Sequence, residues 1–190
     1  MSSPRRAYRA IRASEAYLAW RALAFVFNRV PVRWQRRILD RSNPRFLVGV
    51  AGVGVDASGR VVLARHRFGS PPWRLLGGFI HRRETLPDAL RREIREETGL
   101  EIEVGPILEA STGSRWARVE VVYAYRPVGH APVAASEVDE VRAFETDGLP
   151  PMRIDQRGLI ERHGTAVLSW ARSRSDPATI ALPRRKEGSA

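Results

Sequence analysis

The sequence predicts a sandwich of the α/β or α+β class, built on a mixed sheet and preceded by a helical extension. Two observations indicate this class. Short apolar segments of strand type are interspersed with two segments of helical periodicity. The chain has 190 residues, of which 43% are hydrophobic, and this size suits one domain with extensions better than two domains.

Composition and break signals divide the chain into three regions. Residues 1–43 are predicted to form a basic helical N-terminal extension, which ends at the break signal Asn43-Pro44. Residues 44–172 form the globular domain. Residues 173–190, "SRSDPATIALPRRKEGSA", have the composition of a flexible C-terminal tail.

The globular domain contains segments with the length and apolar content of strands. Residues 46–55, "FLVGVAGVGV", are an apolar run with small residues, typical of a buried strand. The turn sequence "DASG" follows and leads into a second strand, so that residues 46–66 are predicted to form a hairpin. The strands are expected at 46–55, 60–66, 101–111, 115–126 and 141–145.

Two helices are predicted in this domain, and the first has clear start and stop signals. Thr85 is a suitable N-cap, Pro87 lies in the first turn, and Gly99 supplies a left-handed stop. These signals place the first helix at 86–98. A second helical pattern covers residues 154–173 and is expected to close the domain.

Acidic residues gather near the end of the first helix, where they are unfavourable. At 100° per residue, Glu93 and Glu97 fall on the apolar side of the helix and Glu96 lies at its edge. Like charges four residues apart repel, and carboxylates in a last turn oppose the helix dipole by roughly 0.3–1 kcal/mol each. A solvated charge run is the simpler alternative, but it does not explain acids on the inward face. A divalent cation such as Mg²⁺ or Mn²⁺ explains them, because these ions bind clustered carboxylates.

Positive charge is concentrated at the N-terminus. The formal net charge is +11, and residues 1–45 contain 11 arginines against two acidic residues, a net charge of +9. One hypothesis is that this extension packs on the domain or on a second copy of the chain in a homodimer. An anionic membrane surface and RNA are the alternative partners. No segment is expected to span a membrane, because the most apolar run, residues 16–27, is shorter than about 20 residues and contains Arg21.

The chain has no cysteine. This excludes disulfides and zinc sites built from cysteine. It also fits a reducing compartment, so a cytoplasmic location is expected, with a peripheral position at a membrane surface as the alternative.

The acidic helix belongs to a longer pattern. Gly78 is followed after five residues by Glu84, and after seven more by Arg92, which begins the run "REIREETGL" at 92–100. This pattern resembles the Nudix box of the Nudix (MutT-like) hydrolases and matches every fixed position of it. The resemblance implies a Nudix-type α/β/α sandwich with a mixed sheet over roughly residues 44–172.

The resemblance also implies a reaction and a set of metal ligands. Nudix hydrolases cleave diphosphate linkages of nucleotides or nucleoside diphosphate derivatives, with Mg²⁺ or Mn²⁺ as cofactor. By resemblance, Glu96 and Glu97 are the main metal ligands, and Glu93 is a further ligand or the general base. The carbonyl of Gly77 completes the coordination. Glu137 in "SEVDEVRAF" is expected to add a carboxylate from a later loop, with Asp139 and Glu140 as alternative ligands and a surface acidic loop as the simpler alternative for all three.

Two further residues are expected to support these carboxylates. By resemblance, Arg92 orients them through charge-assisted hydrogen bonds, and Glu84 in turn supports Arg92. The sequence departs from the usual box at two positions, since Leu76 replaces a proline and Arg83 replaces a small residue. Neither position supplies a ligand, so we expect a working site with altered loop geometry.

Substrate recognition is expected from residues outside the fixed positions of the box. Phe68 and Trp116, which is preceded by Arg115, are candidates to contact a base, and Arg83 is a candidate to contact a phosphate. Packing of the aromatic rings and solvent exposure of the arginine are the alternatives. The alternative functions are a nucleotide-binding sensor without hydrolysis, and a pyrophosphohydrolase that its basic helices direct to a membrane or to RNA.

Overall fold

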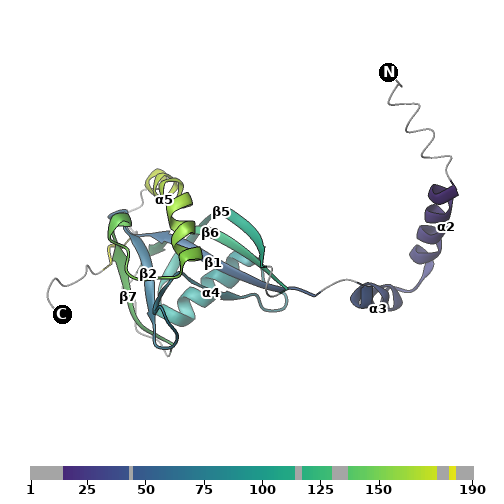
Figure 1. Ribbon diagram of the computed structural model, residues 1–190, viewed down its shortest axis with the longest axis horizontal. Helices are drawn as coiled ribbons and strands as arrows, with labels where there is room; N and C mark the ends of the chain where they lie inside the picture. Colours follow the sequence, from purple (N-terminus) through teal and green to yellow (C-terminus); the bar gives the residue numbers. More distant parts are fainter. Residues whose placement is uncertain (1–14, 43–44, 114–116, 130–136, 175–179, 183–190) are drawn as a thin grey trace, which may run out of the picture. The chain divides into compact units, whose positions relative to one another are not determined.

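The structure is a computed structural model that describes residues 15–42, 45–113, 117–129, 137–174 and 180–182. The chain separates into two units, Met1–Arg45 and Phe46–Ala190. The first unit carries helices α2 (Glu15–Arg29) and α3 (Val32–Ser42). The second carries a mixed sheet and its covering helices (Figure 1). Across the described parts of both units, no helix is long and apolar enough to cross a membrane.

The sheet is built around β1 (Leu47–Val55), which has neighbours along both edges. It pairs antiparallel with β2 (Val61–His66) and β4 (Leu76–Phe79), and parallel with β6 (Arg118–Val128). The predicted hairpin at 46–66 and the predicted mixed sheet are therefore confirmed. The strand order is β3-β2-β1-β6-β5, with β4 paired to β1 and β7 paired to β2. The remaining strands are β3 (Trp73–Arg74), β5 (Glu101–Gly113) and β7 (Val138–Phe144).

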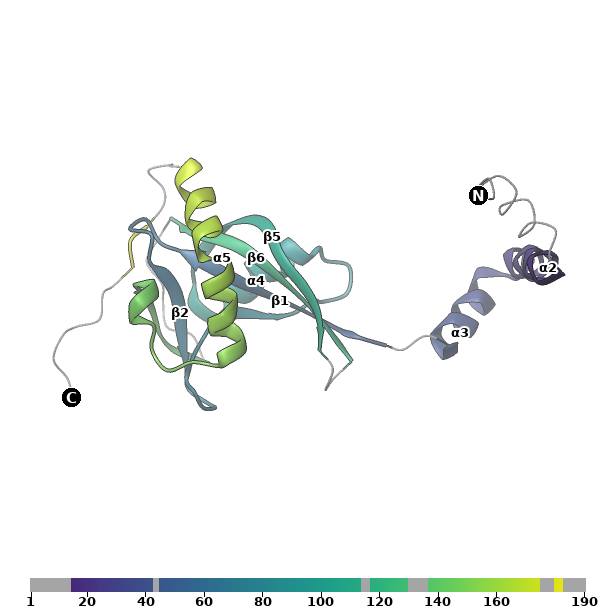
Figure 2. The same cartoon turned by 45° about the horizontal axis from the view of Figure 1, so that its top comes forward.

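Each face of the sheet is covered by one helix. Successive residues of β1 point to opposite faces, so that Val50 packs in one core cluster with Leu90, and Val53 packs in another with Ile160. The two helices are α4 (Leu86–Thr98) and α5 (Ile154–Ser173). Figure 2 shows α5 lying in front of the strands. This arrangement is the predicted α/β/α sandwich.

Helix α4 begins and ends where its capping residues predict. Thr85 has an extended backbone and accepts a hydrogen bond from the N–H of Asp88 at 3.3 Å. Gly99 has a left-handed φ of 70°, and its N–H donates to the carbonyl of Arg95 at 2.8 Å. The two caps fix the two ends of the helix, and the clustered glutamates lie in its C-terminal half.

Replacing Thr85 by alanine is expected to lower the free energy of unfolding by about 1 kcal/mol, because N-cap side chains contribute on that order. Urea denaturation followed by circular dichroism measures the change. Thr146→Ala is the control, since Thr146 is exposed in the short 3₁₀ helix Thr146–Gly148. Equal losses in the two variants would show that the Thr85 cap does not stabilise α4.

The chain returns to the sheet after α5. Asp56 and Arg60, in the turn between β1 and β2, form a buried ion pair at 2.7 Å. The N–H of Leu182 donates to Asp56 at 3.1 Å, and Arg60 donates to the carbonyl of Leu182 at 2.6 Å. The side chain of Leu182 is buried in the core. The prediction of a flexible tail over 173–190 is therefore wrong at residues 180–182. These residues are held by contacts with residues far away in the sequence, and local composition does not indicate such contacts.

Candidate active site

Two adjacent glycines in β4, Gly77 and Gly78, leave space for neighbouring groups that any side chain would displace. Gly77 in β4 has a φ of 151°, and a Cβ atom there would lie 2.1 Å from the carbonyl oxygen of Val50. A Cβ atom on Gly78 would lie 2.3 Å from the carboxyl carbon of Glu93. Gly77 therefore lets β4 pair closely with β1, and Gly78 leaves the space in which the Glu93 carboxylate lies.

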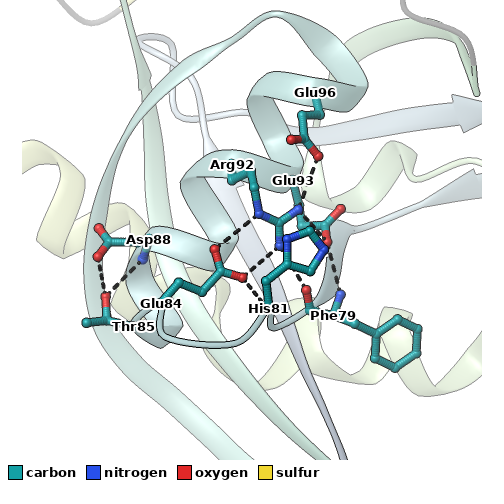
Figure 3. A network of polar contacts seen from close by, with 8 residues as sticks. All are labelled: Phe79, His81, Glu84, Thr85, Asp88, Arg92, Glu93 and Glu96. Atoms are coloured by element: carbon teal, nitrogen blue, oxygen red, sulfur yellow. Dashed lines mark hydrogen bonds and ion pairs between the residues drawn. The ribbon is translucent and has the colours of Figure 1, made fainter.

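Arg92 lies at the centre of a network of carboxylates (Figure 3). Its guanidinium donates to both carboxylate oxygens of Glu84, at 2.9 and 3.1 Å, and to Glu96 at 3.1 Å. It also pairs with Glu93 at 3.0 Å and donates to the carbonyl of Phe79 at 2.9 Å. These contacts raise the pKa of Arg92, with the hydrogen bonds to Glu84 as the largest cause. One side chain thus connects the end of β4, the loop before α4 and α4 itself.

Glu84 and Glu93 are both held by backbone N–H groups as well as by Arg92. Glu84 accepts from the N–H of His81, and Glu93 accepts from the N–H of Phe79 at 3.1 Å. The hydrogen bonds from Arg92, followed by the one from His81, lower the pKa of Glu84 to about 2. Glu84 therefore remains ionised over the working range of pH and provides a constant negative partner for Arg92.

Glu97 is partly buried, as Glu84 and Glu93 are, but it differs from them because one of its carboxylate oxygens lacks a partner among the described residues. Its Oε2 atom is buried and has no hydrogen-bond partner among the described residues. Burial raises the pKa of Glu97 to about 8, and the charges of Glu93, Glu137 and Glu96 act in the same direction. A hydrogen bond from the backbone of Gly77 opposes these effects. The structure thus keeps one carboxylate in a position where its charge lacks a counterion.

Glu137, which directly precedes β7, also belongs to this cluster. Glu137 is exposed, and its charge acts both on Glu97 and on His66. The pKa of His66 is lowered by burial and by Arg74, while Glu137 opposes that shift. The backbone N–H of Arg67 donates to the carbonyl of Glu137 at 3.0 Å, which holds Glu137 at the end of β2.

The donor atoms of the site fit a hard divalent cation. Among the described residues, no three aspartate, glutamate or histidine side chains are arranged to hold a metal ion by themselves. Glu93 and Glu96 are instead paired with Arg92. Mg²⁺, however, usually keeps several waters and takes only one or two carboxylates together with substrate phosphates. The unpartnered oxygen of Glu97, beside further carboxylates, is consistent with such a site for Mg²⁺ or Mn²⁺.

Two of the four predicted substrate residues, Phe68 and Arg83, lie on exposed turns of the described part of the chain. Phe68 lies in the turn between β2 and β3 and is 74% exposed. Arg83 is exposed in the turn before α4 and has a φ of 71°, in the region that favours glycine. Arg115 and Trp116 lie outside the described residues. The contacts of these four residues with a substrate stay predictions. Leu76, in place of the usual proline, is buried in β4.

Phe79 and Arg118 adjoin the carboxylate network but are absent from the residues predicted by the sequence. Phe79 is 46% exposed, and the guanidinium of Arg118 lies 5.1 Å from the centre of its ring. Arg118 also pairs with Glu120 at 3.0 Å. The sequence signal for Phe79 is its place directly after the glycine pair. Arg118 reaches this region only through the parallel pairing of β6 with β1, which no local pattern indicates.

Comparisons with known proteins agree with this architecture. A family model described as the NUDIX domain matches residues 45–163. A MutT-like protein from Streptomyces ambofaciens is 34% identical over 106 residues, which cover 56% of this chain and 68% of that protein. An ADP-ribose pyrophosphatase from Methanocaldococcus jannaschii is 28% identical over 152 residues, covering 72% of this chain and 88% of that protein.

A solved structure shows the same fold. The crystal structure of a NUDIX hydrolase from Nitrosomonas europaea superposes with a TM-score of 0.59 at 19% identity, over 72% of this chain and 77% of that chain. The sandwich with its glutamate-rich helix is the fold of the NUDIX domain. The chain belongs to the Nudix (MutT-like) family, which the spacing of its glycine, glutamate and arginine residues predicts.

Replacing Gly78 by alanine is expected to lower kcat/KM for hydrolysis about tenfold. The added methyl group would displace the carboxylate of Glu93, which the Nudix resemblance gives as a metal ligand or the general base. Changes that disturb the orientation of metal ligands typically reduce metal affinity or activity by about 10–100-fold. Steady-state kinetics measure the loss. Gly148→Ala is the matched control, because a Cβ atom there would meet only Glu145 at 4.0 Å. If the two variants had the same kcat/KM, the space at Gly78 would not matter for the reaction.

Proposed function

We propose that the protein is a divalent-metal-dependent pyrophosphohydrolase that cleaves the diphosphate linkage of a nucleotide or a nucleoside diphosphate derivative. The observation that carries this proposal is the buried, unpartnered oxygen of Glu97, surrounded by the charges of Glu93, Glu96 and Glu137. Such an arrangement is unfavourable unless a cation joins it.

The names of two relatives support the substrate class. One is the ADP-ribose pyrophosphatase already described. The other is an RNA pyrophosphohydrolase from Teredinibacter turnerae, which is 37% identical over 81 residues, covering 43% of this chain and 45% of that protein. Both names describe hydrolysis of a pyrophosphate linkage in a nucleotide-containing molecule.

Carboxylates of α4 and of the loop before β7 form the proposed metal site. Glu97 would hold Mg²⁺ or Mn²⁺ with one further carboxylate, that of Glu96 or Glu137, and with phosphate oxygens of the substrate. The carbonyl of Gly77 is a further donor, and Glu93 is either a further ligand or the general base. When bound, such an ion neutralises phosphate oxygens and lowers the pKa of water. The carboxylates contribute to the same reaction by giving a hard cation the oxygen donors that it prefers.

The remaining residues of the network position the catalytic groups. Arg92 is a positioning residue that holds Glu93, and ionised Glu84 holds Arg92 in turn. We assign the role of general base to Glu93, because Phe79 and Arg92 fix the direction of its carboxylate. A base needs such a fixed direction to take a proton from an attacking water within hydrogen-bond reach. Glu137 is the alternative base.

A panel of substrates tests this proposal. The purified full-length protein is incubated with nucleoside triphosphates and nucleoside diphosphate derivatives in Mg²⁺, in Mn²⁺ or in EDTA, and the products are separated by ion-exchange chromatography. We expect a nucleoside monophosphate and a second phosphorylated product with either metal, and no product in EDTA. Reaction in ¹⁸O-labelled water then identifies the phosphorus that is attacked.

Two outcomes would contradict the proposal in different ways. Nucleotide binding in calorimetry without any product would identify a nucleotide sensor instead of an enzyme. Undiminished turnover in EDTA would show that the protein hydrolyses the substrate without a divalent metal.

A further inference from the structure

The N-terminal unit carries two amphipathic helices that form no core of their own. None of the side chains described between residues 17 and 41 is buried. In α2, Trp20, Leu23 and Val26 lie within an arc of about 120° and are exposed, and Leu18 and Phe25 are exposed on the opposite side of the helix. In α3, Val32 and Trp34 are exposed on one half of the helix, and the other half carries Arg33, Arg36, Arg37 and Arg41. Apolar faces of this kind need a partner surface to be removed from water.

A fixed corner joins the two helices. The side chain of Gln35 in α3 donates to the carbonyls of Phe27 at 2.8 Å and Val30 at 2.9 Å, at the end of α2. The Phe27 carbonyl also accepts from the N–H of Val30 at 3.1 Å, so that Gln35 adds a second hydrogen bond at this helix end. The helices therefore act as one unit, although each is too short to cross a bilayer of about 30 Å.

The cationic and aromatic groups of the unit lie directly beside one another. The guanidinium of Arg29 lies 3.8 Å from the ring centre of Phe25, and that of Arg37 lies 5.3 Å from the ring of Trp34. Residues 15–42 contain six arginines against two acidic residues. Apolar rings with an adjoining cation suit the boundary between acyl chains and anionic headgroups.

We propose that this unit binds the surface of an anionic lipid membrane, with its apolar side chains at the acyl boundary and its arginines among the headgroups. RNA would attract the arginines but would leave aliphatic side chains such as Leu23 and Val32 in water. A second copy of the chain would cover the apolar faces, but it would bring together two segments that each carry a net charge of +9 over residues 1–45. An anionic lipid surface both attracts the arginines and removes the apolar side chains from water.

Co-sedimentation with vesicles tests the proposal with the full-length protein. We expect binding to vesicles that contain phosphatidylserine, much weaker binding to phosphatidylcholine alone, and weakening as salt rises from about 0.1 to 0.5 M. The triple variant Arg33→Gln/Arg36→Gln/Arg37→Gln should bind on the order of a hundredfold more weakly. The double variant Leu23→Ala/Trp34→Ala should bind about tenfold more weakly.

Matched variants in the other unit control for total charge and total apolar surface. The triple variant Arg153→Gln/Arg162→Gln/Arg174→Gln removes three exposed arginines there, and Ile154→Ala removes an exposed apolar side chain. Both should bind vesicles as the wild-type protein does. Hydrolytic activity of every variant, measured without vesicles, reports whether the Nudix unit remains folded.

Three results would overturn the proposal. The first is binding that does not depend on charge, seen either as equal binding of the wild-type protein to both kinds of vesicle or as unchanged binding of the triple arginine variant of α3. The second is tighter binding to single-stranded RNA than to anionic vesicles, unaffected by Leu23→Ala/Trp34→Ala, which would identify RNA as the partner. The third is a dimer in sedimentation equilibrium that the same double variant dissociates, which would identify a second copy of the chain.

Discussion

A Glu97→Gln variant is expected to hydrolyse its diphosphate substrate about a thousandfold more slowly than the wild-type protein. Glutamine preserves the size of the side chain but removes its negative charge. A catalytic metal typically contributes several kcal/mol of charge stabilisation. In the proposed metal site that contribution would depend on Glu97, whose buried oxygen has no partner among the described residues. The measurement is kcat and KM at a series of Mg²⁺ concentrations, up to saturation.

Glu101→Gln is the matched control for this prediction. The same chemical change is made four residues later, where Glu101 is exposed and pairs with Arg95 at 3.2 Å. Because an exposed pair of this kind contributes little, this variant should retain wild-type kinetics. A Glu97→Gln protein within tenfold of the wild-type kcat at saturating Mg²⁺ would remove Glu97 from the proposed metal site.

Local signals were sufficient to predict the helix that carries these glutamates. Its capping residues predict residues 86–98, and the structure places α4 at Leu86–Thr98. Helical periodicity predicts that Glu93 and Glu97 point inward, and the structure has both partly buried. Capping and periodicity depend only on neighbouring residues, which is why a single sequence contains this information.

Long-range pairing determined the parts of the site that the sequence did not predict. The four residues of β4 include two glycines and have no strand pattern, and they form a strand only because β1 pairs with them. β6 runs parallel to β1 and carries Arg118 toward Phe79. The pairing of β7 with β2 brings the loop of Glu137 near Glu97 and His66. Strand register of this kind depends on residues far apart in the sequence.

The metal-free protein, maintained with EDTA, is expected to lose stability as the pH rises from about 4.5 to about 8. Burial raises the pKa of Glu97, assisted by the charges of Glu93, Glu137 and Glu96 and opposed by the backbone of Gly77. Between these two pH values the folded protein keeps a proton that the unfolded chain has released. The free energy of unfolding contributed by this group is therefore present below about pH 4.5 and falls as the pH rises through 8.

Glu97→Gln should remove this loss, so that the metal-free variant is more stable than the wild-type protein by roughly 3 kcal/mol at pH 7. Urea denaturation of both proteins in EDTA, from pH 4 to pH 9, measures the difference, which should vanish below about pH 4.5. His66 also titrates, but with a lowered pKa and in both proteins, so its contribution cancels in the difference. Equal stabilities at pH 7 would mean that the Glu97 carboxylate is not destabilised by burial, and the main physical argument for a cation beside it would be lost. A more stable but inactive variant would show that this carboxylate is retained for the reaction at the expense of folding.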